Sequence, residues 1–223
     1  MTASPTSYHA AQSIALRLVD AGFNPVDERA RFPQGAGRFF VVRHGAVIAW
    51  RQPERIGDTT GLRIIGAHTD SPALKVKPEA SFSCRGWGQI AVEIYGGPLL
   101  NSWLDRELGI AGRIVTRDGA QHLVHLDSVA RLPQLAIHLD RGVNDGLTLD
   151  RQANTQPVFT LDAEPDLLAA LAEQAGVKAS DVLGHDLFTY SSQPPARFGL
   201  HGEFFASGRL DNLSSTHAGV TAI

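Results

Sequence analysis

The residues of this chain best suited to metal chemistry are a histidine and two aspartates. His68 and Asp70 follow an apolar run, residues 62–67, that we interpret as a buried strand. His68 can offer a neutral imidazole nitrogen to a divalent metal ion, and Asp70 can accept the other ring N–H and so fix the tautomer. For this pair alone, a loop histidine beside a turn-forming Asp-Ser-Pro is the better interpretation.

A second carboxylate stands at a similar junction near the C-terminus. Asp211 follows the apolar run 204–206, and Asn212 can cap the helix that we expect after it. Carboxylates that bridge two metal ions about 3.5–4 Å apart are a standard part of hydrolytic two-metal sites. Because His68 and Asp211 are far apart in the sequence, only a fold can bring them together.

Five segments of the chain together resemble the aspartyl aminopeptidases, family M18 of the cocatalytic metallopeptidases. They are GAHTDSPALKVKP, GGPLLNSWLDRELGIAGRI, LAIHLDR, LGHDLFTY and SGRLDNLSS. The likeness runs in order through nearly the whole chain, and it is more specific than any single motif. It implies a zinc-type exopeptidase that removes acidic residues, Asp or Glu, from the N-termini of peptides. It also implies a homo-oligomer, built from dimers up to a tetrahedral dodecamer.

The resemblance also implies roles for particular residues. His68 would bind one of two divalent metal ions, Asp211 would bridge both ions, and Asp70 would serve catalysis by orienting His68. Zinc is the expected metal, and cobalt or manganese also suit histidine and carboxylate ligands. His138, in LAIHLDR, is expected to lie on an apolar strand. The resemblance implies that it contacts substrate in the active site of a partner subunit. The alternative is that it is a core histidine.

Two further side chains, those of His185 and Glu203, are not expected to have catalytic roles. His185 matches the family in LGHDLFTY, and a structural hydrogen bond is the better interpretation of it. Glu203 is the nearest carboxylate upstream of Asp211, but it does not match the general base of the family.

The fold class that we expect is α/β: the first part of a cocatalytic metallopeptidase α/β sandwich, with an inserted, mostly β dimerisation subdomain. Residues 1–88 would form the N-terminal part of the catalytic domain. Residues 89–200 would form the inserted subdomain, and residues 201–223 would return the chain to the catalytic sheet.

Local patterns predict the elements of these parts. The first part should hold a helix that ends at Gly22 and a β-hairpin that turns at His44-Gly45. His44 suits that turn because histidine tolerates a positive φ. The inserted part should hold one helix and several short strands, which we place at 165–176, 90–95, 108–115, 121–126 and 135–139.

Composition narrows the function classes. A formal net charge of −3 without a long basic run argues against nucleic-acid binding. No apolar run approaches the roughly 20 residues of a membrane span, and no signal peptide is visible. The single cysteine, Cys84, forms no internal disulfide and fits a reducing cytoplasm.

The sequence offers fewer metal ligands than a catalytic zinc site usually has. His68 and Asp211 are two ligands, whereas a catalytic zinc usually has three from protein. The family takes its general base and remaining ligands from sequence after the Asp-Asn segment, so we expect a C-terminal complementary polypeptide as a partner. The alternative is a non-catalytic truncated paralogue that acts as an oligomerisation module. Another class of two-metal exopeptidase ranks lower, because it lacks the GGPLLNSW and LAIHLDR segments.

The isolated chain is therefore expected to have no peptidase activity. The test is hydrolysis of acidic aminoacyl substrates by the purified chain, with zinc or manganese added and no other chain present. Turnover above that of a heat-inactivated sample would contradict the expectation.

Overall fold

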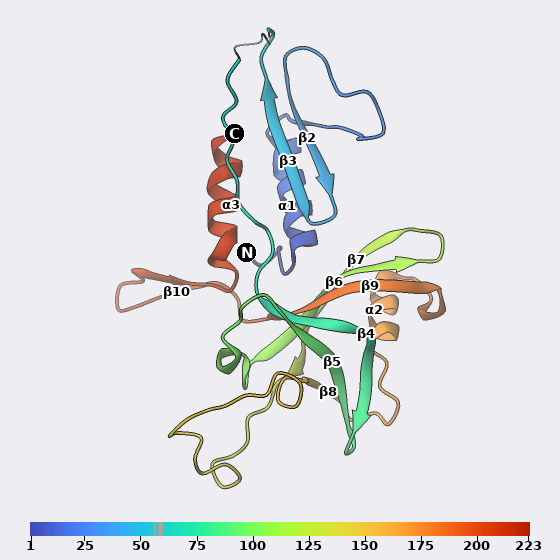
Figure 1. Ribbon diagram of the computed structural model, residues 1–223, viewed down its shortest axis with the longest axis vertical. Coiled ribbons are helices and arrows are strands. Elements are labelled where there is room, and N and C mark those ends of the chain that lie inside the picture. The colour runs from blue at the N-terminus through green and yellow to red at the C-terminus, as the bar shows by residue number, and fades with distance from the viewer. Residues whose placement is uncertain (56, 58–59) are drawn as a thin grey trace. The chain divides into compact units, whose positions relative to one another are not determined.

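The computed structural model describes residues 1–55, 57 and 60–223, and the chain divides into two compact units. Unit 1 comprises Met1–Ser71 and Pro195–Ile223, and unit 2 comprises Pro72–Pro194 (Figure 1). The expected mixed α/β class with a mostly β insertion is confirmed. Among the described residues, no helix combines the length and the apolar character that a membrane span requires.

The observed boundaries differ from those expected at residues 88 and 200. β4 (Ala73–Cys84) pairs with β5 (Trp87–Tyr95) from one end to the other, with Ala73 opposite Tyr95 and Cys84 opposite Trp87. A boundary after residue 88 would therefore cut a hairpin whose two strands are hydrogen-bonded along their length. The insertion begins before β4 instead.

Unit 1 opens with the expected helix and hairpin. α1 (Ser7–Asp20) is followed by β1 (Asn24–Pro25), and β2 (Gly37–Arg43) and β3 (Ala46–Gln52) form the hairpin. The sheet has the order β1-β2-β3, with β1 parallel to β2 and β2 antiparallel to β3. One face of α1 packs on this sheet around four buried side chains: Ile14, Leu18, Phe23 and Phe40.

The turn of this hairpin confirms the reason given for His44. Its φ is 55°, in the left-handed region, where histidine is among the better tolerated residues. Gly45 is required for a different reason. A Cβ atom on Gly45 would lie 2.5 Å from the Ser7 hydroxyl, so the missing side chain lets the start of α1 approach the turn.

The predicted buried strand at 62–67 is wrong. Residues 61–72 form no strand, and the side chains of Leu62 and Ile64 are 86% and 85% exposed. An apolar run indicates that other residues will cover the segment. A strand also needs a neighbouring strand that pairs with its backbone N–H and C=O groups. None of the described strands supplies that neighbour.

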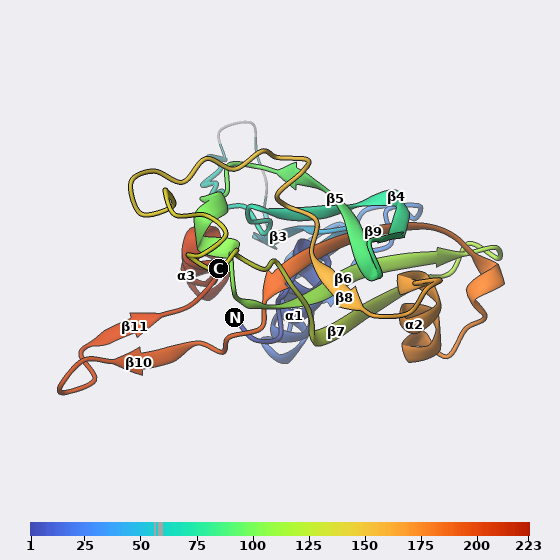
Figure 2. The ribbon, with the colours of Figure 1, turned by 90° about the horizontal axis from the view of Figure 1, so that it is seen from below.

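The C-terminal part of unit 1 holds a ribbon and a helix. β10 (Ala196–Phe198) and β11 (Phe204–Ala206) pair with each other in an antiparallel ribbon, not with the sheet of β1, β2 and β3 (Figure 2). α3 (Leu210–Ala222) follows, and Asp211 and Asn212 have non-helical backbone angles. The predicted cap by Asn212 is not formed, because its buried side-chain oxygen accepts no hydrogen bond.

Unit 2 is a closed barrel with strand order β4-β5-β8-β7-β6-β9. Its remaining strands are β6 (Glu107–Thr116), β7 (Gln121–Arg131), β8 (Val158–Thr160) and β9 (Val182–Ser191). The strands predicted at 90–95, 108–115 and 121–126 are confirmed within β5, β6 and β7. Large apolar side chains fill the barrel, and several are fully buried: Leu74, Ile90, Val92, Leu108, Ile110, Ile114, Val124 and Leu187.

Three short helices complete unit 2. α2 (Leu167–Ala175) confirms the predicted helix: the Asp166 carboxylate accepts a hydrogen bond from Ala169 N at 2.9 Å, and Gly176 ends the helix with a φ of 69°. Leu167 and Leu171 of α2 join the barrel core. Two 3₁₀ helices, η1 (Leu100–Trp103) and η2 (Ala179–Asp181), lie before β6 and β9.

The predicted strand at 135–139 is wrong. Residues 133–157 contain turns and no strand, and Leu135, Ile137 and Leu139 are exposed. Gln156, at the C-terminal end of this loop, attaches the loop to β5. The side chain of that buried residue accepts from Val92 N at 2.8 Å and donates to Val92 O at 3.3 Å. It thereby takes the place of a strand along this part of β5.

Close packing of β6 against β9 gives a test of the barrel. A Cβ atom on Gly112 would lie 2.0 Å from the carbonyl oxygen of Asp186, whereas one on Gly184 of β9 would meet nothing within 4 Å. Gly112→Ala should therefore lower the free energy of unfolding by about 1–3 kcal/mol, the usual cost of overpacking. Urea denaturation measures this change. Equal stability of Gly112→Ala and the matched control Gly184→Ala would contradict the packing described.

Candidate metal centre

The structure brings His68, Asp70 and Asp211 together in unit 1. His68 Nδ1 lies 3.0 Å from the backbone oxygen of Asp70 and 3.3 Å from its Oδ1. On the other side of the ring, His68 Nε2 lies 3.3 Å from Asp211 Oδ1. The imidazole thus stands between two carboxylates that come from distant parts of the sequence.

Oxygen acceptors face both ring nitrogens of His68: two belong to Asp70 and one to Asp211. A neutral histidine carries one N–H, and at Nδ1 that N–H can donate to Asp70. Nε2 then presents a lone pair to Asp211 Oδ1, which is also an acceptor. Two acceptors at this distance repel each other unless a proton or a metal cation lies between them. The short distance between Nε2 and Oδ1 is thus compatible with either a proton on Nε2 or a metal cation between the two atoms.

The distance between the two acceptors fits a shared zinc ion. With zinc–nitrogen and zinc–oxygen distances of about 2.0–2.2 Å and tetrahedral angles, two ligand atoms lie about 3.4 Å apart. The observed separation of Nε2 and Oδ1 is 3.3 Å. Within the described residues, however, no group of three or more His, Cys, Asp or Glu side chains could hold a metal ion. Of the described residues, His68 and Asp211 have the geometry of one pair of metal ligands.

These side chains are open to solvent. The exposed fractions are 51% for His68, 47% for Asp70 and 90% for Asp211. Charged contacts at such exposed positions contribute little to stability, because water screens them and the side chains lose freedom. Direct ion pairing is therefore a weak reason for these three groups to be assembled.

A side-chain hydrogen bond ties the histidine segment to the β2–β3 hairpin. The Thr69 hydroxyl donates to the carbonyl oxygen of Gly45 at 2.6 Å, which ties the loop 68–71 to the turn between β2 and β3. Asp211 stands at the start of α3, where its non-helical backbone angles carry it out of the regular helix. A rigid hairpin and a helix end thus present the two ligands.

His138 lies in unit 2, in the loop 133–157. It is exposed and stands in a turn, so the prediction that it belongs to an apolar strand is wrong. The physical reason is the one given for the strand itself: no partner strand is available in this loop. Its contact with substrate across a subunit boundary stays a prediction.

The two side chains that received no catalytic role have structural surroundings. His185 Nε2 lies 3.3 Å from the carbonyl oxygen of Pro78, which confirms the expected hydrogen bond. Glu203 closes the turn of the β10–β11 ribbon. Hydrogen bonds from its own backbone N–H and from that of His201, at 2.8 Å for the latter, lower the pKa of its carboxyl group. A lowered pKa makes Glu203 a poor general base.

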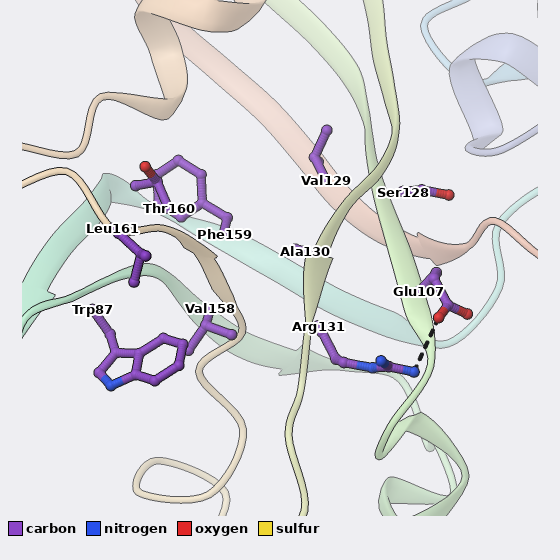
Figure 3. A pocket seen from close by; sticks show the side chains of 10 residues that line it. All are labelled: Trp87, Glu107, Ser128, Val129, Ala130, Arg131, Val158, Phe159, Thr160 and Leu161. Atoms are coloured by element: carbon purple, nitrogen blue, oxygen red, sulfur yellow. Dashed lines mark hydrogen bonds and ion pairs between the residues drawn. The ribbon is translucent and has the colours of Figure 1, made fainter.

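The barrel of unit 2 carries a separate open pocket of about 340 Å³ (Figure 3). Its walls are mostly apolar, and Arg131 pairs with Glu107 at 3.0 Å along one side. The lining residues are Trp87, Glu107, Ser128, Val129, Ala130, Arg131, Val158, Phe159, Thr160 and Leu161. None of the predicted site residues lines it. Sequence reasoning missed this pocket because its lining residues come from four separate strands and share no motif.

Comparison with known proteins gives one consistent result. The family model described as aminopeptidase I zinc metalloprotease (M18) matches residues 1–223. The probable M18 family aminopeptidase 2 of Streptomyces coelicolor is 50% identical over 228 residues, which cover 100% of this chain and 53% of that protein. Its counterpart in Mycobacterium leprae is 39% identical over 231 residues, which cover 100% of this chain and 54% of that protein. The chain spans about half the length of the curated relatives it matches.

Solved structures show the same relationship. The cryo-EM structure of the Ape4 and Nbr1 complex contains a chain that matches with a TM-score of 0.92 and 31% identity, over 99% of this chain and 48% of that one. The mApe1 dodecamer of S. cerevisiae matches with a TM-score of 0.83 and 26% identity, over 99% of this chain and 53% of that one. In both cases the similarity extends through both units.

Proposed function

The chain belongs to the M18 family of aminopeptidase I zinc metalloproteases, and on that premise we propose that it forms part of a metallo-aminopeptidase that removes acidic residues from peptide N-termini. One observation carries the proposal: His68 Nε2 and Asp211 Oδ1, which come from distant parts of the sequence, lie 3.3 Å apart, as two ligands of one metal ion would. A cation between them explains this approach. The preference for acidic residues rests on the resemblance of the sequence to the aspartyl aminopeptidases.

In this proposal each of the three residues has a distinct task. His68 would hold a zinc ion, and Asp211 would be a ligand shared with a second divalent ion. Asp70 accepts the Nδ1–H of His68, which fixes the ring and makes Nε2 a stronger electron donor. When bound, the metal lowers the pKa of a water molecule and polarises the peptide carbonyl.

The missing ligands and the general base come, we propose, from a C-terminal complementary polypeptide. The exposure of the apolar segment 62–67 supports this, because the side chains of Leu62, Ile64 and Ile65 are suited to being covered. So does the fact that the chain matches only 53% of its S. coelicolor relative.

We further propose that the protein assembles as a homo-oligomer, from dimers up to a dodecamer, as the related mApe1 does. The exposed turn that carries His138 would then reach the active site of a partner subunit, where the imidazole would contact substrate. A cytoplasmic location agrees with the free thiol of the exposed Cys84.

A second candidate function is that of a non-catalytic oligomerisation module. It is favoured by one observation: the described residues hold no cluster of three metal ligands. This candidate predicts a stable, self-associating chain that needs no complementary polypeptide and shows only weak metal binding.

Reconstitution tests the proposed function. The chain is co-expressed with the C-terminal part of its S. coelicolor relative, the part that follows the matched region, and the complex is assayed with zinc on Asp, Glu and Leu p-nitroanilides. We expect hydrolysis of the acidic substrates in preference to the leucine substrate, loss on chelation and recovery with zinc. His68→Ala and Asp211→Asn should abolish it, because each removes a ligand, whereas Glu203→Gln is the matched control and should not.

Two results would contradict the proposal. Either a stable complex hydrolyses none of the substrates, or His68→Ala retains full activity. A chain that self-associates and captures no complementary polypeptide would instead support the oligomerisation module.

A further inference from the structure

Two hydroxyl groups connect the segments that carry His68 and Asp211. We propose that Ser71 and Thr216 are positioning residues that hold the two metal ligands at their separation. The inference rests on the proposed function, because it takes His68 and Asp211 as a metal-binding pair. Neither hydroxyl touches the metal ligand atoms; each acts through the backbone of the other segment.

Thr216 reaches out of its helix. Its Oγ1 donates to the carbonyl oxygen of His68 at 2.9 Å, and the residue is 9% exposed. A Ser or Thr hydroxyl within a helix usually bonds to a carbonyl one turn earlier in the same helix. Ser214 and Thr221 of α3 do so, to Leu210 O at 2.7 Å and His217 O at 2.8 Å. The Thr216 hydroxyl instead donates to the segment that carries His68.

Ser71 makes the reciprocal connection. Its Oγ donates to the carbonyl oxygen of Asp211 at 3.0 Å. The histidine end of the loop 68–71 is thus tied to Thr216, and its serine end is tied to Asp211. The two hydrogen bonds close a ring through the loop and the start of α3. Because this ring restrains the backbone of both segments, the distance between the His68 and Asp211 side chains changes mainly by side-chain rotation.

The approach of α3 to the preceding residues supports the same arrangement. A Cβ atom on Gly219 would lie 3.1 Å from a methyl carbon of Ile65, so α3 lies close to the extended segment one turn beyond Thr216. Leu213 and Thr216 are the buried residues of this helix. The hydroxyl bond is therefore formed on the packed face of α3, where a lost bond is not readily replaced by water.

Exposure of the metal ligands explains why such bonds are needed. The side chains of His68 and Asp211 are 51% and 90% exposed, so close packing does not fix them. A metal site needs its ligand atoms placed to within roughly 0.5 Å before the ion arrives. Hydrogen bonds from neighbouring groups commonly supply that order, and their loss lowers metal affinity by about 10–100-fold.

The test measures Co²⁺ binding at His68 in the full chain by NMR, as paramagnetic broadening of the His68 ring signals. Thr216→Val and Ser71→Ala should each raise the Co²⁺ concentration for half-maximal broadening by about tenfold, the lower end of the range for supporting groups. Thr216→Ser keeps a hydroxyl and should restore the wild-type value. Thr221→Val and Ser214→Ala are the matched controls, because each removes an internal hydroxyl bond of the same helix, and they should leave binding unchanged.

The outcomes separate this inference from the proposed function. Wild-type affinity in both Thr216→Val and Ser71→Ala overturns the positioning role and leaves the metal pair intact. Equal loss in Thr221→Val and Thr216→Val also overturns it, because helix stability alone would then explain the effect. Absence of any His68 broadening that depends on Asp211, tested with Asp211→Asn, overturns the proposed metal pair itself and the positioning role with it.

Discussion

Two atoms that both lack a proton repel each other at short range, and a proton or a metal cation between them removes the repulsion. This consideration bears on His68 Nε2 and Asp211 Oδ1, which lie 3.3 Å apart while Asp70 contacts the other ring nitrogen. Much of unit 1 can be understood from it. The hairpin turn at Gly45, the loop 68–71 and the start of α3 meet where this pair stands, and hydroxyl-to-carbonyl hydrogen bonds join them. This convergence of groups from distant parts of the sequence is the basis on which we propose a metal site here.

The two units differ in how far their own residues bury apolar side chains and pair backbone groups. The barrel of unit 2 closes on itself and fully buries the large apolar side chains of its core. Among its described residues, unit 1 has a small core, an unpaired apolar segment at 62–67 and no cluster of three or more side chains that could hold a metal. These three features concern different kinds of interaction, yet all would be resolved by additional polypeptide beside the same segment. That agreement is the physical basis for proposing a complementary C-terminal part.

Sequence patterns predicted the local structure well wherever a short-range cause was at work. The turn at His44, the helix that ends at Gly176 and the strand at 108–115 each follow from backbone preference or alternation within a few residues. The strands at 62–67 and 135–139 failed for a common reason. An apolar run indicates that a segment will be covered, but it does not indicate whether a neighbouring strand is present to pair with it.

The meeting of His68 and Asp211 could not be derived from their spacing, and only the family resemblance linked them. The hydroxyls of Ser71 and Thr216 carried no usable signal, because serine and threonine are common and their partners here are backbone carbonyls. The most direct test of the account is anomalous diffraction at the zinc edge from crystals of the zinc-loaded protein. The account predicts zinc at about 2.0–2.2 Å from both His68 Nε2 and Asp211 Oδ1. Zinc bound elsewhere, with His68 Nε2 still directly against Asp211, would contradict it.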